Sequence, residues 1–280
     1  GPYNFNKVAS QQFSKYDMAI WTTMSYFKPT EVGQYSNDYP VTGTNYGNFK
    51  ESQTPMIFDI AAAQQLYGKP SNGPLTDGGQ IFGFNSNIKG DAAALYDFNQ
   101  NKTPIIAIWD GGTNNTLDLS GFDKPSTVSL EAGTYSSVAG LKNNLSIAFN
   151  TVIETAIGGS AADSLTGNSA NNVLKGSAGD DYLNGAGGFN YALYNDATSK
   201  YAITITAANE TFTVSDKFGN DGTDTVINTQ QLNFSNGTLT TSDFSIVRTL
   251  SQNGIDKLVD LYVEINQRAP DSCLLYTSPS

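Results

Sequence analysis

The 280-residue sequence contains no histidine and a single cysteine, Cys273. Without histidine, the chain cannot by itself build a Ser-His-Asp or Cys-His nucleophile, a histidine general base, or a zinc site with histidine ligands. One cysteine cannot form a disulfide within the chain. These 280 residues therefore cannot by themselves form the most common hydrolytic or zinc-dependent active sites.

Basic residues are also scarce, because 15 Lys and Arg stand against 26 Asp and Glu, for a net charge of −11. No nucleic-acid partner is expected, since a phosphate backbone is held by clustered lysine and arginine. The longest apolar runs, such as PIIAIW at 104–109, are far too short for a membrane span. An acidic chain of this kind suits the binding of hard cations through oxygen ligands.

The residues that are abundant point to strands and turns. Glycine numbers 27, and tyrosine and phenylalanine number 15 each. Short β-prone runs such as QIFGF at 80–84 are separated by Gly, Asn and Asp, which is typical of a mainly β protein. The alternating segment YAITITAANETFTVSD at 201–216 predicts one strand pair, and GTDTVINTQQLNFSNGTLT at 222–240 predicts another.

One helix is expected in the first third of the chain, within TPMIFDIAAAQQLYG at 54–68. Thr54 is suited to the N-cap, Pro55 to the first helical position and Gly68 to the position after the last turn. An apolar stripe at helical spacing predicts that one face of this helix packs on a core. The stripe consists of Met56, Ile60, Ala63 and Tyr67.

Residues 158–193 repeat with a period of nine. The rows are GGSAADSLT, GNSANNVLK, GSAGDDYLN and GAGGFNYAL, starting at 158, 167, 176 and 185. The sixth place holds Asp163, Asn172, Asp181 and Asn190, and the eighth holds Leu165, Leu174, Leu183 and Ala192. This pattern matches the calcium-binding nonapeptide G-G-x-G-x-D-x-U-x of RTX repeats.

The spacing has a physical explanation. The glycine-rich half of each row turns the chain with its carbonyl groups inward, and the other half is a short strand with one inward apolar side chain. Two rows complete one coil, so row one should stack on row three, and row two on row four. Asp163 and Asp181 would then repel each other unless a cation lay between them. The candidate Ca²⁺ ligands in these turns are Asp163, Asp181, Gly158, Ser160, Gly176 and Ala178, with Asn172 and Asn190 in a second stack that should bind more weakly.

Several blocks together resemble a known family. They are TMSY at 23–26, DIAAAQQLYG at 59–68, QIFGFNSN at 80–87, AIWDGGTNNTLDLSGF at 107–122, LKNNLSIAFNTVIETAIGGS at 141–160, and the nonapeptides. In this order they resemble serralysin-type secreted zinc metalloproteases, metzincins of the peptidase M10B type. The resemblance implies a mainly β chain, in which the C-terminal edge of an α+β metzincin protease domain precedes a right-handed parallel β-roll and further strands.

The resemblance also implies roles for individual residues. Met24 would be the methionine of the turn beneath the zinc, and Tyr26 would face the zinc and hydrogen-bond the tetrahedral intermediate. The zinc motif of the family, H-E-x-x-H-x-x-G-x-x-H, is not in this sequence. We therefore expect that the chain starts just after the third histidine, holds no catalytic Zn²⁺ and is inactive alone. Further Ca²⁺ ligands would be Thr76, Gly78, Gln80, Asp110, Gly112, Asn115 and Glu154, with Asn115 in place of the family's usual aspartate.

The expected domain boundaries follow from these assignments. Residues 1–68 would end the protease domain, 69–193 would form the serralysin-type calcium roll, and 194–247 would continue it with strands. Residues 248–272 resemble the start of a small helical domain of secreted bacterial proteins. The sequence CLLYTSPS at 273–280 matches the translation of a sequencing adaptor and is interpreted as an artefact.

Two functional hypotheses result. In the first, the chain belongs to a monomeric, calcium-dependent zinc endopeptidase that cleaves extracellular proteins or peptides and leaves the cell by type I-like export. In the second, it is a non-catalytic Ca²⁺-binding RTX module of another exported protein or adhesin. The repeats are compatible with both, and TMSY with DIAAAQQLYG favours the first.

Overall fold

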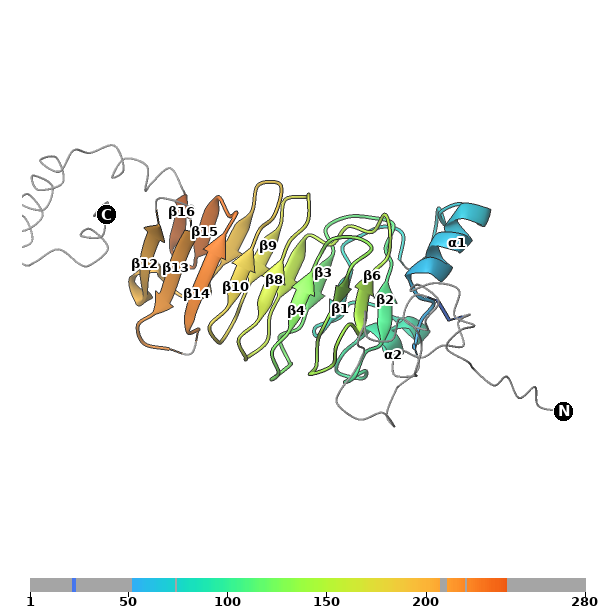
Figure 1. Ribbon diagram of the computed structural model, residues 1–280, viewed down its shortest axis with the longest axis horizontal. Helices are drawn as coiled ribbons and strands as arrows, with labels where there is room; N and C mark the ends of the chain where they lie inside the picture. The colour runs from blue at the N-terminus through green and yellow to red at the C-terminus, as the bar shows by residue number, and fades with distance from the viewer. Residues whose placement is uncertain (1–21, 24–51, 74, 207–210, 220, 241–280) are drawn as a thin grey trace, which may run out of the picture.

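The computed structural model describes residues 22–23, 52–73, 75–206, 211–219 and 221–240. These residues form an elongated roll of short strands, with helix α1 at its N-terminal end (Figure 1). The helical elements are α1 (Ile57–Tyr67), η2 (Gly90–Ala92), α2 (Ala93–Tyr96) and η3 (Thr198–Lys200). The strands are β1 (Ile81–Gly83), β2 (Ile106–Ile108), β3 (Thr116–Asp118), β4 (Thr127–Ser129), β5 (Tyr135–Ser136), β6 (Leu145–Ile147), β7 (Thr155–Ile157), β8 (Ser164–Thr166), β9 (Val173–Lys175), β10 (Tyr182–Asn184), β11 (Tyr191–Leu193), β12 (Tyr201–Thr206), β13 (Thr211–Asp216), β14 (Thr223–Ile227), β15 (Gln231–Phe234) and β16 (Gly237–Thr240).

Two largely parallel sheets form the walls of the roll. The seven-stranded sheet has the order β1-β3-β7-β9-β11-β15-β16, and the six-stranded sheet has the order β12-β13-β14-β10-β8-β4. Neighbours within the roll pair in parallel, so the chain passes from one sheet to the other at each turn. The predicted fold class, a mainly β chain with a parallel β-roll, is confirmed.

The nonapeptide rows stack as the period of nine predicts. Strand β8 of row one pairs with β10 of row three, with Leu165 opposite Leu183. Strand β9 of row two pairs with β11 of row four, with Leu174 opposite Ala192. Each row therefore supplies one three-residue strand, and its eighth residue points into the roll.

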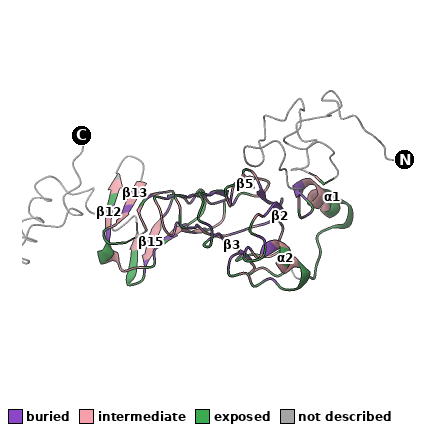
Figure 2. Ribbon diagram, turned by 90° about the horizontal axis from the view of Figure 1, so that it is seen from below, coloured by how far each residue is buried: buried purple, intermediate pink, exposed green. Residues whose placement is uncertain are grey.

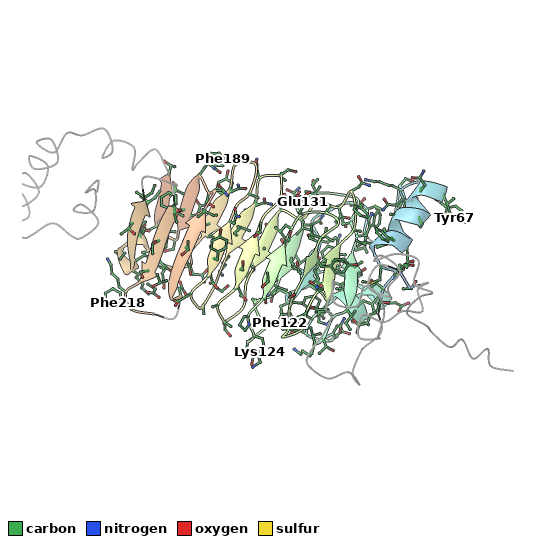
Figure 3. All side chains as sticks on the ribbon, viewed as in Figure 1. Tyr67, Phe122, Lys124, Glu131, Phe189 and Phe218 are labelled. Atoms are coloured by element: carbon green, nitrogen blue, oxygen red, sulfur yellow. The ribbon has the colours of Figure 1, made fainter. Side chains whose placement is uncertain are left out.

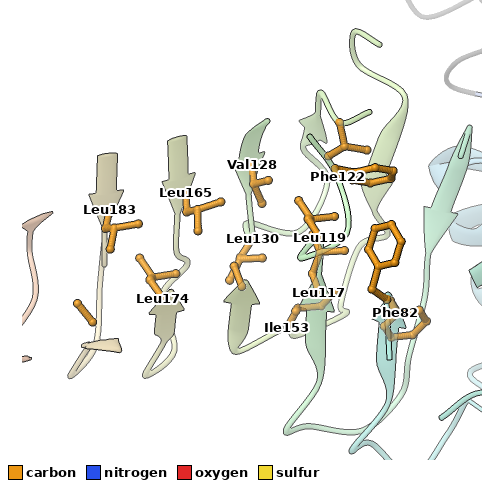
Figure 4. Close-up of a cluster of buried hydrophobic side chains, with 14 of the residues drawn as sticks. Phe82, Leu117, Leu119, Phe122, Val128, Leu130, Ile153, Leu165, Leu174 and Leu183 are labelled. Carbon is orange, nitrogen blue, oxygen red and sulfur yellow. The ribbon is translucent and has the colours of Figure 1, made fainter. Parts of the chain in front are cut away.

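The core is a narrow line of side chains between the two walls. Val128, Leu165 and Leu183 line it from one sheet, and Leu117 and Leu174 line it from the other (Figure 4). The four leucines are 0% exposed and Val128 is 2% exposed. Because one large side chain per strand fills this space, the stability of the roll depends strongly on each of them.

The segment at 201–216 forms the expected antiparallel pair, β12 and β13. The segment at 222–240 differs from the predicted single pair, because its strands divide between the two walls. Strand β14 pairs with β10 and places Val226 opposite Leu183. Strand β15 pairs with β11 on the other wall, and β16 then pairs with β15. The segment thus adds another coil to the roll, a tertiary arrangement that local alternation does not reveal.

Helix α1 differs from prediction at its start. Thr54 is not the N-cap, because its hydroxyl accepts the N–H of Ala107 at 2.8 Å and ties the chain to β2. The helix begins after Met56, whose N–H donates to the Asp59 carboxylate at 2.9 Å. Gly68, with φ of 78°, ends the helix as predicted.

The expected burial of the apolar stripe on α1 is wrong beyond its first turn. Met56 is 1% exposed, whereas Tyr67 is 86% exposed. Figures 2 and 3 show the C-terminal half of α1 projecting from the roll, with Tyr67 at its far end. Ile60 and Ala63 line an open hollow together with Trp109. Burial of α1 is therefore confined to its start, at Met56 and Ile57, among the residues that the structure describes.

Candidate metal sites

Three aspartates stack along one edge of the six-stranded sheet, and we call Asp163, Asp181 and Asp224 the aspartate column. The N–H of Asp163 donates to Oδ1 of Asp181 at 2.7 Å, and the N–H of Asp181 donates to Oδ1 of Asp224 at 3.0 Å. Their exposures are 3%, 2% and 1%. Parallel pairing of β8, β10 and β14 produces this stack, since residues in register lie side by side.

The column contains a carboxylate oxygen that no hydrogen bond satisfies. Both oxygens of Asp163 accept backbone N–H groups, from Ser126 and Gly159, each at 2.6 Å. Oδ2 of Asp181, in contrast, is buried without a partner. A β-carbon added to Gly176 would lie 2.1 Å from Oδ2 of Asp181. The oxygen therefore lies against the first glycine of its own row, where a side chain would have no room. A buried carboxylate oxygen without a donor is costly unless a cation is bound there.

The electrostatics of the column agree with that conclusion. Burial, together with the charge of Asp181, raises the pKa of Asp224 to about 8. Burial likewise raises the pKa of Asp181 to about 7, with the charge of Asp163 adding to the effect. In the described part of the chain, the ion pair Lys200–Asp196 lies at the surface, and no lysine or arginine pairs with the column. The column therefore concentrates negative charge without a protein counter-ion.

The second stack lies along the seven-stranded sheet, and we call Asn172, Asn190 and Gln230 the amide column. The N–H of Asn172 donates to Oδ1 of Asn190 at 2.8 Å, and the N–H of Asn190 donates to Oε1 of Gln230 at 2.7 Å. Both asparagines are 0% exposed. The two columns thus have the same backbone ladder but different charge.

The structure also brings together the candidate ligands upstream of the repeats. A β-carbon on Gly112 would lie 2.2 Å from the N atom of Gly78, so the loops at 76–80 and 110–115 are in contact. The N–H of Gln80 donates to Oδ1 of Asn115 at 3.0 Å, and the N–H of Asn115 donates to Oε2 of Glu154 at 2.8 Å. Thr76 lies at the same junction, its backbone 3.5 Å from a β-carbon added to Gly111.

Asp110 is the acidic centre of this upstream cluster. It is 0% exposed, and its Oδ1 accepts the N–H of Gly112 at 2.7 Å and the side-chain amide of Asn115 at 3.1 Å. Its Oδ2 is buried without a hydrogen-bond partner. As in the aspartate column, a buried carboxylate oxygen therefore has no hydrogen-bond donor, a need that a bound cation would meet.

Calcium suits these donor sets better than a transition metal. Among the described residues, no three His, Cys, Asp or Glu side chains converge as a metal-binding group. A bound ion would therefore take a few carboxylate oxygens and otherwise backbone carbonyl groups, an all-oxygen set that Ca²⁺ accepts in flexible geometry. The predicted sources of such carbonyl groups are Gly158, Ser160, Gly176 and Ala178, in the turns that precede Asp163 and Asp181.

The repeat predicted from the sequence, residues 158–193, did not include Asp224. Its signal is present in the sequence, because GNDGTDTVI at 219–227 repeats the G-x-x-G-x-D-x-U-x pattern. The row is separated from row four by the β12–β13 hairpin, so a search at a fixed period of nine does not reach it. The tertiary structure returns it to the stack, with Gly222 packed on the backbone of Gly179.

Met24 and Tyr26 lie outside the described residues. The two residues directly before Met24 are described, and both donate hydrogen bonds to Asp59 of helix α1. Its carboxylate accepts the hydroxyl of Thr22, and also the N–H and hydroxyl of Thr23 at 2.8 and 3.1 Å. Burial alone would raise the pKa of Asp59, but these hydrogen bonds and that from Met56 together lower it. No helix in the described ranges has the length and apolarity needed to cross a membrane.

Comparison with known proteins places this geometry in context. Residues 71–270 match the family described as peptidase M10 serralysin C terminal. Serralysin C of Dickeya chrysanthemi is 41% identical over 149 residues, covering 53% of this chain and 28% of the relative. Serralysin of Proteus mirabilis is 39% identical over 147 residues, and metalloprotease AprA of Pseudomonas entomophila is 38% identical over 150. The chain spans only about a quarter of the length of these relatives, at 28%, 27% and 28%.

Proposed function

The chain belongs to the peptidase M10 serralysin C-terminal family, and from that premise we propose that it is the C-terminal portion of a secreted, calcium-dependent zinc metalloendopeptidase acting on extracellular proteins. The observation that carries the calcium part is the aspartate column, with its unsatisfied Asp181 oxygen. The names of the relatives, serralysins and a metalloprotease, support the protease part.

In this proposal, calcium is bound by the aspartate column and by the upstream cluster around Asp110. When bound there, the ion supplies positive charge to carboxylates that have no protein counter-ion. Extracellular calcium modules bind with dissociation constants of about 10⁻⁴ to 10⁻³ M, so such a roll would be empty inside the cell and filled outside. Because binding is coupled to folding, the roll would fold on export.

Asp181→Ala is expected to raise the calcium concentration needed for folding by about tenfold or more, because the variant loses one carboxylate ligand. Asn190→Ala, at the equivalent place in the amide column, should raise this midpoint much less. The measurement is a calcium titration followed by far-ultraviolet circular dichroism, with both variants started from the calcium-free state.

Both substitutions remove a buried polar side chain, so a general loss of stability would move both midpoints alike. Equal midpoints for the two variants would contradict the assignment of calcium to the aspartate column. A much larger shift in Asp181→Ala supports it.

The protease part of the proposal concerns Met24 and Tyr26. Met24 would form the methionine turn below the zinc, and the Tyr26 phenol would donate a hydrogen bond to the oxyanion that develops during peptide hydrolysis. The family's zinc ligands are absent from these 280 residues, so the parent protein would have to supply them. The hydrogen bonds from Thr22 and Thr23 to Asp59 support a fixed position for the start of this turn.

Tyr26→Phe in the full-length protein is expected to lower kcat for peptide hydrolysis by about 10²-fold, with a smaller effect on KM. The reason is that removing one oxyanion donor typically costs this much in the transition state. Tyr67→Phe is the matched control, since the same hydroxyl is removed from a residue that is 86% exposed. Unchanged kcat in Tyr26→Phe would contradict the assigned role, and absence of any peptidase activity would favour a non-catalytic RTX module.

A further inference from the structure

We propose that calcium serves only one of the two nonapeptide stacks, because side-chain amide groups take the place of the cation in the other. The aspartate column would bind Ca²⁺, while the amide column would be complete without it. The proposal rests on the proposed function of the aspartate column and adds that the two nonapeptide stacks differ in their dependence on calcium.

Asn190 shows how an amide fills such a turn. Its Nδ2 donates to the carbonyl oxygens of Gly187 and Asn228, each at 2.9 Å, and lies 3.5 Å from that of Gly188. Its Oδ1 accepts the N–H of Asn172. The nitrogen is thus surrounded by the turn carbonyl groups that a nonapeptide would offer to a cation.

Asn172, one coil earlier, is also fully hydrogen-bonded, but its amide is turned the other way, with Oδ1 beside Gly167. Its Nδ2 donates to the carbonyl oxygen of Glu154 at 3.3 Å and to Oδ1 of Asn168 at 3.1 Å. Its Oδ1 accepts the N–H of Asn168 at 2.9 Å. Both ends of the amide are therefore used, although the side chain is fully buried.

The equivalent positions of the two columns can be compared directly. A β-carbon added to Gly176 would lie 2.1 Å from Oδ2 of Asp181, and one added to Gly185 would lie 2.5 Å from Nδ2 of Asn190. A donor nitrogen in row four thus stands where row three has an unsatisfied oxygen. Asp181 has a buried side-chain atom without a partner, whereas in the described structure Asn172, Asn190 and Gln230 have none.

The chemistry of the two groups explains the difference. A carboxylate offers only acceptors, so an aspartate facing carbonyl oxygens needs a cation between them. An amide offers two N–H donors of its own, and it carries no net charge to repel the next residue of the stack. A calcium ion entering the amide column would have to displace these hydrogen bonds and would gain no carboxylate ligand from either asparagine.

Asn190→Asp tests the proposal by restoring the carboxylate. At a calcium concentration that just folds the parent chain, the variant should melt about 5 °C or more below it, because its carboxylate faces carbonyl oxygens. With millimolar calcium, this deficit should disappear, and the variant should bind one additional Ca²⁺, counted by isothermal titration calorimetry and native mass spectrometry. Asn171→Asp is the matched control, since it adds the same charge at an exposed neighbouring position whose Oδ1 accepts the N–H of Phe189.

The reciprocal variant, Asp181→Asn, keeps the proposal testable if Asn190→Asp fails to fold. It should lose one Ca²⁺ and should retain more β-sheet circular dichroism than the parent chain when calcium is absent. The proposal is overturned if Asn190→Asp gains no ion while Asn190→Ala loses one, because the amide column would then already hold calcium. A parent chain that binds no calcium, with an Asn190→Asp variant that gains one ion, would contradict the proposed function while supporting the role of the amide.

Discussion

Removal of calcium is expected to abolish most of the β-sheet circular dichroism of residues 75–240, and millimolar calcium is expected to restore it. Asp163, Asp181 and Asp224 are almost fully buried and have no cationic partner among the described residues. Without an ion, the roll must either hold these charges together or protonate them. Either alternative lowers the free energy of unfolding.

The loss of β structure should be large because the repulsion between the aspartates is large. Strands in a sheet are about 4.8 Å apart, and at an effective dielectric constant near 20 like charges at that distance repel by roughly 3–4 kcal/mol. The column has two such neighbouring pairs, Asp163 with Asp181 and Asp181 with Asp224. Their combined repulsion is comparable with the total stability of a domain, about 5–15 kcal/mol. Identical spectra with and without chelator would contradict the prediction.

The same charges set the pH dependence of the calcium-free chain. Burial raises the pKa of Asp181 to about 7 and that of Asp224 to about 8, from an ordinary value of 3.8. A raised pKa means that the folded state favours the neutral form, so stability is highest below the ordinary value and is lost as the pH rises through 7–8. Calcium-free protein should therefore retain more β structure near pH 5 than near pH 8.5.

Leu183→Ala is expected to lower the free energy of unfolding in saturating calcium by about 2–5 kcal/mol. Leu183 is 0% exposed and lies between Leu165 and Val226 in the line of inward side chains. The core is one side chain wide per strand, so neighbouring groups cannot collapse into the space that the substitution leaves. Urea unfolding followed by circular dichroism measures the change.

Leu193→Ala provides the matched control for this substitution. Leu193 ends strand β11 of the next row and is 38% exposed. The same change of side chain should cost about 0.5 kcal/mol or less there, as at most surface positions. Similar losses for Leu183→Ala and Leu193→Ala would show that the narrow core does not control the stability of the roll.

Repetition explains which features of the fold were predictable. The nonapeptides specify a turn and a strand every nine residues, so the four strands from β8 to β11 and their pairing in alternate rows followed from the sequence. The alternation at 201–216 likewise predicted β12 and β13. In each case the signal is local, because the spacing of a few residues determines both the turn and the inward side chain.

Features that depend on distant partners were not predicted. Thr54 has a side chain suited to an N-cap, but its hydroxyl accepts a hydrogen bond from the N–H of Ala107. The helix therefore starts after Met56. Asp224 joins the aspartate column only because β14 returns to β10 across an inserted hairpin. The segment at 222–240 divides between two walls for the same reason, since each strand pairs with the previous coil on its side.

The sequence by itself determined the mainly β class, the row-by-row repeat and the alternation of aspartate with asparagine at the sixth place. The tertiary structure decided what that alternation means. Stacking rows two apart separates the two residue types into different columns, so that the charges gather on one wall and the amides on the other. Only then does an unsatisfied oxygen appear at Asp181, while the equivalent nitrogen of Asn190 donates to the carbonyl groups of its turn. The physical reason is that a charge or a hydrogen-bonding group acts on its neighbours in space, and successive members of the aspartate column are 18 or more residues apart in the chain.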